Sequence, residues 1–140
     1  MSNNSVVITS ALRTAVGSLN KSLKNIQGFE LGSAVISSSL KKSELKPDEI
    51  DEVIMGQVLT GGAGQNPARQ ALIHAGIPKE KPAYVVNQVC GSGIRSVASG
   101  FQIILSGDSK IVVAGGQESM SLAPHAIHLR DGKKLGDTEL

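Results

Sequence analysis

The sequence has few aromatic residues, a single cysteine and no long hydrophobic run. Of its 140 residues, two are Phe, one is Tyr and none is Trp. The core must therefore be built from aliphatic side chains and alanine, as in parallel sheets that are covered by helices. A protein that stacks the bases of single-stranded nucleic acid on aromatic rings is excluded. The net charge of +2, from 14 basic and 12 acidic residues, is too balanced to indicate any nucleic-acid partner.

One cysteine, Cys90, excludes an internal disulfide and a cysteine-rich metal site, and it is typical of a reducing compartment. The strand-like segment Val6-Val7-Ile8 begins almost at once, with no basic and apolar leader before it. No apolar run reaches the length of a membrane span. These absences predict a cytoplasmic protein with no membrane partner and no metal site.

Strand-like and helix-like segments alternate along the chain. Short β-branched or apolar runs predict strands at 6–9, 53–58, 83–87 and 110–115. Apolar residues at helical spacing predict helices at 29–40, 67–75 and 92–106. The resulting βαβαβαβ order has crossovers long enough for right-handed parallel connections. It predicts the α/β class, with a parallel sheet between layers of helices.

The predicted helix 92–106 has two unlike sides. One side is apolar, and the other carries small or polar residues with only Arg95 charged. A side that faces solvent is normally rich in Lys and Glu. We therefore expect a second layer of protein to pack closely on the small-residue side, which would be uncovered in the isolated chain. Its members are Ser92, Ser96, Ser99, Gly100 and Gln102.

Cys90 lies where a predicted strand gives way to this helix. A thiolate there is stabilised by the positive end of the helix dipole. Gly91 and Gly93 carry no side chains, so backbone N–H groups and an acyl ligand can approach the sulfur. The alternative is an inert, buried cysteine, which is the more common kind.

Other candidate motifs favour structural roles. The glycine-rich stretch 61–64 lacks the Gly-Lys-Ser/Thr of a phosphate loop, which favours a hinge or packing loop. His125 and His128 have no third ligand at matching spacing, and His74 is expected to be a packing residue. Glu118 is a candidate base, but we expect it to lie against a backbone amide.

The segment Asn87-Gln88-Val89-Cys90-Gly91-Ser92-Gly93 resembles the nucleophile motif of the thiolases, specifically the acetyl-CoA acetyltransferases. Further segments resemble signatures of this family in the family's order, almost to the C-terminus. They are Arg13-Thr14-Ala15-Val16-Gly17, Met55-Gly56-Gln57-Val58, Gly64-Gln65-Asn66-Pro67-Ala68-Arg69-Gln70, Ala114-Gly115-Gly116-Gln117-Glu118-Ser119-Met120-Ser121, Ala123-Pro124-His125 and His128-Leu129-Arg130. The Asn-Pro-Ala-Arg-Gln and Gly-Gly-x-Glu-Ser-Met segments favour a thiolase over a related ketoacyl or hydroxymethylglutaryl synthase.

The resemblance implies a thiolase-like fold, of which the chain is the N-terminal βαβαβαβ half. In the family two such halves stack in five layers, α-β-α-β-α. Residues 1–117 would form the N-terminal α/β half. Residues 118–140 would begin the coenzyme-binding and tetramerisation loop region.

The resemblance also implies a reaction. Cys90 would attack acetyl-CoA and become acetylated, and its own backbone N–H would help to hold the oxyanion. A second acetyl-CoA would then give acetoacetyl-CoA, or the reverse reaction would cleave it. Coenzyme A thioesters are substrates, so no cofactor is expected. Family members are homo-oligomers, dimers or tetramers.

Three family motifs are missing from the sequence: Asn-Glu-Ala-Phe, Gly-His-Pro and a second cysteine in Cys-x-Gly. In the family they belong to the C-terminal half, and the last two supply the activating histidine and the acid/base cysteine. We therefore expect slow or no turnover by this chain alone, poor solubility or oligomerisation, and a separate C-terminal half as a candidate partner. The alternative is a non-catalytic thiolase-like fragment that acts only in assembly. The sequence identifies no substrate-binding residue.

Overall fold

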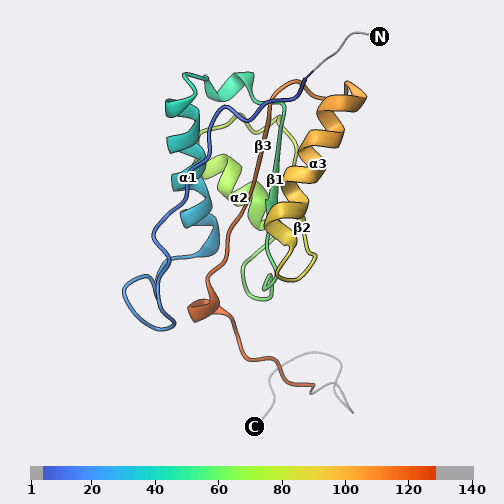
Figure 1. Cartoon of the computed structure of the whole chain (residues 1–140). Helices are drawn as coiled ribbons and strands as arrows, with labels where there is room; N and C mark the ends of the chain where they lie inside the picture. The colour runs from blue at the N-terminus through green and yellow to red at the C-terminus, as the bar shows by residue number, and fades with distance from the viewer. Residues whose placement is uncertain (1–4, 129–140) are drawn as a thin grey trace.

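A computed structural model of the chain describes residues 5–128 (Figure 1). Its helices are α1 (Gly28–Lys42), α2 (Pro67–His74) and α3 (Ser92–Ser106), and its strands are β1 (Glu52–Gly56), β2 (Ala83–Val86) and β3 (Val112–Gly116). Two 3-10 turns, Pro47–Glu49 and Met120–Leu122, precede β1 and follow β3. All three predicted helices and three of the four predicted strands are confirmed. No helix in the described part of the chain is both long and apolar enough to span a membrane.

The three strands form a parallel sheet in the order β2-β1-β3. Val53 in β1 is in register with Ala83 in β2 and with Val113 in β3. Helices α1 and α2 pack together on one side of the sheet, and α3 lies on the other (Figure 1). This is the predicted arrangement of a sheet between helical layers.

The main hydrophobic core lies between α1, α2 and one face of β1. It consists of aliphatic side chains, alanine and one methionine, as the scarcity of aromatic residues requires. Its buried members are Ile36, Leu40, Ile50, Val53, Met55, Ala68, Ala71, Leu72 and Ile77. Strand residues alternate between the two faces, so Ile54 and Gly56 point to the opposite side, toward α3.

Helix α3 contacts the sheet through small residues. Ser92, Ser96 and Gly100 recur every four residues along one side of the helix, and all three are buried. A Cβ atom built on Gly56 would lie 2.4 Å from the carbonyl carbon of Ser92, so the backbones of β1 and α3 are in direct contact. The Ser96 hydroxyl donates to the carbonyl oxygen of Gly115 at 2.6 Å.

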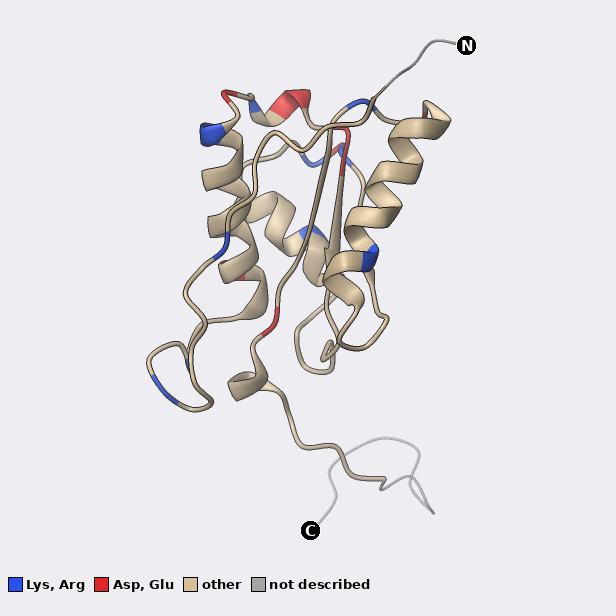
Figure 2. Ribbon diagram, viewed as in Figure 1, with Lys and Arg blue, Asp and Glu red and all other residues tan. Residues whose placement is uncertain are grey.

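The expectation that the small-residue side of this helix is uncovered is therefore wrong for Ser92, Ser96 and Gly100, which are buried against the sheet; of its other members, Ser99 is half-buried and Gln102 is exposed. Part of the apolar side faces outward: Ile94 is 73% exposed, Phe101 49% and Leu105 54%, whereas Val97, Ala98 and Ile104 are half-buried. Large side chains would hold the helix away from the sheet, whereas serine and glycine allow close approach, and the serine hydroxyls find carbonyl acceptors. Arg95 is the one charged residue of α3, and the ribbon of this helix is otherwise tan in Figure 2.

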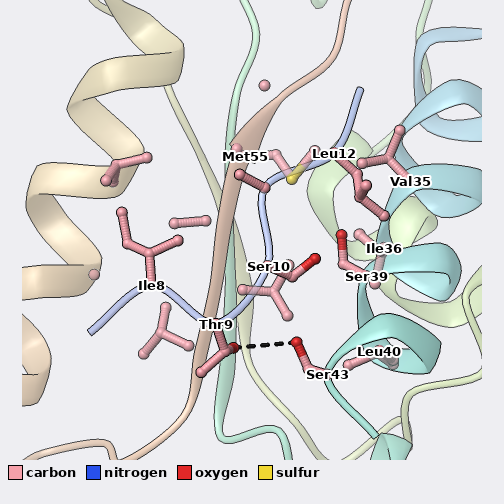
Figure 3. A pocket seen from close by; sticks show the side chains of 18 of the residues that line it. Ile8, Thr9, Ser10, Leu12, Val35, Ile36, Ser39, Leu40, Ser43 and Met55 are labelled. Atoms are coloured by element: carbon pink, nitrogen blue, oxygen red, sulfur yellow. Dashed lines mark hydrogen bonds between the residues drawn. The ribbon is translucent and has the colours of Figure 1, made fainter. Parts of the chain in front are cut away.

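The predicted strand at 6–9 is absent. This segment pairs with no strand of the sheet, and Val7 and Ile8 are largely exposed. A cavity of about 830 Å³ lies between the segment, α1, α3 and β3 (Figure 3). The Thr9 hydroxyl instead accepts a hydrogen bond from Ser43 at the end of α1, at 3.1 Å. β-Branched residues favour an extended backbone, but a strand also needs a partner's backbone within reach.

Asp51 ties the start of β3 to β1. Its carboxylate accepts the backbone N–H of Lys110 at 2.7 Å and that of Ile111 at 3.0 Å. Its own N–H donates to the Ile111 carbonyl oxygen at 2.9 Å. The hydrogen bonds from Ile111 and Lys110 to the ionised carboxylate hold the pKa of Asp51 below its ordinary value.

We predict that Asp51→Asn lowers the free energy of unfolding at neutral pH, because an amide oxygen binds N–H groups more weakly than a carboxylate does. A lowered folded pKa stabilises the fold above the unfolded pKa, and this contribution is lost as the pH falls through the folded pKa. The stability difference between the two chains should therefore shrink below about pH 4. Urea unfolding from pH 7 to pH 2.5 measures this, and Asp48→Asn on the exposed preceding turn is the control. A difference that stays constant with pH would contradict the prediction.

The contact between β1 and α3 makes a second prediction. Gly56→Ala should destabilise the chain by about 1–3 kcal/mol, because the new methyl group meets backbone that cannot move aside cheaply. Gly93→Ala is the matched control, since a Cβ there meets nothing within 4 Å. That control should be neutral or slightly stabilising, as glycine is unfavourable in a helix. Equal unfolding midpoints for the two variants would contradict close backbone packing.

Candidate functional site

Cys90 is exposed and lies between the end of β2 and the first turn of α3. Gly91 is the N-cap residue of α3, so the thiol is next to the N-terminal end of the helix. The carboxyl ends of all three parallel strands meet at this edge of the sheet, which is where ligands bind in open α/β sheets. The predicted setting of Cys90 at a strand-to-helix junction is confirmed, and the alternative of a buried cysteine is wrong.

The backbone before Cys90 is strained. Val89 has a φ of 51°, in the left-handed region, which a β-branched residue rarely adopts. In the turn, Gly91 N–H donates to the Gln88 carbonyl oxygen at 3.0 Å, and Ser92 N–H donates to the Val89 carbonyl oxygen at 3.1 Å. The Cys90 N–H donates neither of these bonds. The turn thus presents the Cys90 thiol at the surface.

Two side chains brace this turn. The Val89 N–H donates to Asn87 Oδ1 at 3.0 Å. The Ser92 hydroxyl donates to the Val89 carbonyl oxygen at 2.6 Å and accepts the Gln88 N–H at 2.8 Å. Ser92 also makes the contact with Gly56, so one residue serves both the packing of α3 and the shape of the turn.

A cavity of about 350 Å³ opens beside Cys90. Its walls come from the Cys90 turn, the first residues of α3 and the segments that follow β1 and β3. Among the described residues that line it, only Cys90 and Glu118 carry ionisable side chains. The cavity therefore combines the thiol with one carboxylate and with the polar side chains of Ser92, Gln57 and Gln117.

Glu118 lies against backbone amides, as predicted. One carboxylate oxygen accepts the Val58 N–H at 2.8 Å, and the other accepts the Leu59 N–H at 3.3 Å. Because both oxygens are engaged, Glu118 is poorly placed to take a proton from a substrate. It fixes the segment that follows β1.

A buried pair of glutamines next to this cavity was missed by sequence reasoning. Gln57 is 3% exposed and Gln117 6%, and Gln117 Nε2 donates to Gln57 Oε1 at 2.9 Å. Each follows a strand that ends in glycine, and Gly56 is in register with Gly116. The repeated Gly-Gln at the ends of two neighbouring parallel strands was the signal that could have found the pair.

The remaining candidate residues, three histidines and the glycine-rich loop, show no sign of a binding site among the residues that the structure describes. His74 packs against Phe29, with ring centroids 4.8 Å apart, but it is exposed and not partly buried as we expected. His125 and His128 are exposed. Within residues 5–128 no three His, Cys, Asp or Glu side chains cluster as metal ligands would. In the 61–64 loop, a Cβ on Gly62 would lie 3.3 Å from Pro124, which fits a packing loop.

Comparison with known proteins identifies the family. The family model for "Thiolase, N-terminal domain" matches residues 6–140. An acetyl-CoA acetyltransferase of Rhizobium meliloti is 56% identical over the whole chain, and one of Shinella zoogloeoides is 54% identical over the whole chain. In both cases the match covers 36% of the relative, so the chain spans about a third of its length.

A solved structure supports the same conclusion. The crystal structure of the Bacillus anthracis acetyl-CoA acetyltransferase is similar to this chain, with a TM-score of 0.86 and 36% sequence identity. The likeness covers 95% of this chain and 34% of that one. It confirms the predicted α/β fold of the N-terminal thiolase half. With the sequence match over residues 6–140, it shows that the chain belongs to the thiolase family, in its N-terminal domain.

Proposed function

We propose that the chain supplies the acyl-accepting nucleophile, Cys90, of an acetyl-CoA acetyltransferase. The observation that carries the proposal is the exposed thiol on a strained turn at the N-terminal end of α3. The positive end of the helix dipole favours a thiolate there, and a thiolate is both a good nucleophile and a good leaving group for acyl transfer. The names of the relatives supply the substrate class, acetyl-CoA.

The proposed reaction has two steps. In the first, Cys90 Sγ attacks the thioester carbonyl carbon of acetyl-CoA, the carbon–sulfur bond to coenzyme A breaks, and acetyl-Cys90 remains. In the second, an acetyl-CoA that has lost a methyl proton attacks the acetyl carbonyl. The bond to Sγ breaks, and acetoacetyl-CoA leaves with Cys90 restored as a thiolate. The reverse sequence is thiolysis.

The backbone N–H of Cys90 is the proposed oxyanion donor. It donates neither turn hydrogen bond, and it lies beside the attacking sulfur. A donor that is already oriented stabilises the negative charge that develops on the carbonyl oxygen. The proposal requires no cofactor and no metal, because coenzyme A thioesters are the substrates.

A base for the second step must come from other polypeptide. Within residues 5–128 no histidine lines the cavity beside Cys90, and the Glu118 oxygens accept backbone N–H groups. We propose that a region equivalent to the unmatched two-thirds of the relatives supplies this base, in the same or a separate chain. The outward apolar side of α3, with Ile94, Phe101 and Leu105, is the proposed contact surface.

Three further parts of the proposal follow the family. Residues 118–140 would begin the coenzyme-binding and tetramerisation region, and the complete enzyme would be a homo-oligomer. A cytoplasmic location is supported by the rat relative, which is named as cytosolic. The second candidate function, assembly without catalysis, is favoured only by the exposed apolar side of α3.

Acetylation tests the proposal. The chain is mixed with acetyl-CoA and with the C-terminal part of the Rhizobium meliloti relative, from the residue after the matched region onward, and its intact mass is measured. We expect one acetyl group on Cys90, none on Cys90→Ser, and slow or no acetylation of the chain alone, because the activating groups are missing.

The outcomes separate the two candidate functions. Size-exclusion chromatography of the same mixture reports whether the two polypeptides assemble. Assembly without acetylation would favour the non-catalytic function. Rapid turnover by the chain alone would contradict the requirement for a second polypeptide, and unchanged acetylation of Cys90→Ser would contradict the role of Cys90.

A further inference from the structure

Val89 needs outside support to keep its conformation. A β-branched residue in the left-handed region costs about 1–3 kcal/mol and persists only where its surroundings over-determine it. The bond from Val89 N–H to Asn87 Oδ1, at 3.0 Å, is one such support. It acts directly on the peptide group that precedes the strained residue, so the orientation of the Asn87 side chain affects where Cys90 points.

The Asn87 amide is oriented in turn by Val58. Asn87 Nδ2 donates to the Val58 carbonyl oxygen at 3.2 Å, while its Oδ1 accepts from Val89. This bond joins the segment after β2 to the segment after β1. Because it fixes which end of the amide faces Val89, the position of the Val58 carbonyl matters to the turn.

Val58 is held by Glu118. The Val58 N–H donates to Glu118 Oε2 at 2.8 Å, and the next N–H, that of Leu59, donates to Oε1 at 3.3 Å. Hydrogen bonds to an ionised carboxylate are roughly twice as strong as those between neutral groups. A single carboxylate that engages two successive N–H groups therefore fixes the short segment between them.

We propose that Glu118 is a positioning residue for Cys90. Its carboxylate fixes Val58, the Val58 carbonyl orients Asn87, and Asn87 holds Val89 in the left-handed conformation that presents the thiol. We call this chain of contacts, Glu118–Val58–Asn87–Val89, the relay. Cys90, Val58, Val89 and Glu118 all line the 350 Å³ cavity, so most of the relay borders a single cavity. The inference rests on the proposed function only in taking Cys90 as the reacting group.

The test is the rate at which iodoacetamide alkylates the sole cysteine of the 140-residue chain at fixed pH, followed by intact mass. Alkylation requires neither acetyl-CoA nor a second polypeptide, so its outcome is separate from that of the acetylation test. The urea-unfolded chain gives the alkylation rate of the same thiol when no folded structure orients it. We expect Glu118→Ala and Asn87→Ala each to slow alkylation on the order of two- to fivefold, toward the unfolded rate, as the helix N-terminus loses its hold on the thiolate.

A double-mutant cycle identifies the relay. Glu118→Ala combined with Asn87→Ala should be no slower than either single variant, because both break the same chain of contacts. Glu118→Gln, whose amide oxygen can still accept the Val58 N–H, should give a rate between those of Glu118→Ala and the unsubstituted chain. This rescue separates positioning from a general loss of folding, which circular dichroism monitors in each variant.

Gln70→Ala is the matched control. Gln70 Nε2 braces the neighbouring loop through the carbonyl oxygens of Ala63 and Gln65, at 2.8 and 3.0 Å, and has no bond to the relay. It should leave the alkylation rate unchanged. Effects of Glu118→Ala and Asn87→Ala that multiply in the double variant, or an unchanged rate in Glu118→Ala, would overturn the proposal. If Glu118→Ala does not fold, the cycle is repeated with Glu118→Gln in its place. The double variant of Glu118→Gln and Asn87→Ala should then be alkylated no more slowly than Asn87→Ala alone.

Discussion

The direct contact between the backbones of β1 and α3 is the constraint on which the rest of this structure depends. At Gly56 there is no room for a side chain, because the carbonyl group of Ser92 occupies that space. The contact fixes how deeply α3 lies on the sheet. It also fixes Ser92, whose hydroxyl bonds both arms of the turn that carries Cys90. Helix packing and thiol placement are thus set by the same residue.

The same contact determines what the outer surface of the molecule looks like. Since the small residues of α3 are used against the sheet, its large apolar residues are left outside. Ile94, Phe101 and Leu105 are all about half exposed or more, on a helix with a single charged residue. Exposed apolar surface of this kind marks an interaction site.

Local pattern was sufficient to predict much of the fold. The helix at 92–106 was predicted to the residue, and the three strands of the sheet followed from short apolar runs. The strand at 6–9 failed because pairing is not local: Val7 and Ile8 favour an extended backbone but cannot supply a partner. The orientation of α3 failed for another reason. Hydrophobicity predicts which side of a helix avoids water, whereas the glycine at 56, far away in sequence, decides which side fits the sheet.

The candidate site shows the same division. Cys90 and its setting could be predicted, because a strand, a cysteine, two glycines and a helix are adjacent in the sequence. The support of that turn could not, because Glu118, Val58 and Asn87 are separated by about 30 residues or more along the chain and meet only through the parallel order of the sheet. The buried pair of Gln57 and Gln117 is equally non-local, although the dipeptide Gly-Gln occurs at the end of both strands that carry the pair.

The orientation of α3 is the central claim, and cysteine accessibility tests it most directly. In a Cys90→Ser background, Ile94→Cys and Ser96→Cys are compared for their rates of modification by a thiol reagent in dilute, folded protein. We predict that Ile94→Cys reacts nearly as fast as it does in urea, whereas Ser96→Cys reacts only as the chain unfolds. Fast modification of Ser96→Cys together with protection of Ile94→Cys would contradict the orientation of the helix and the placement of Cys90 that follows from it.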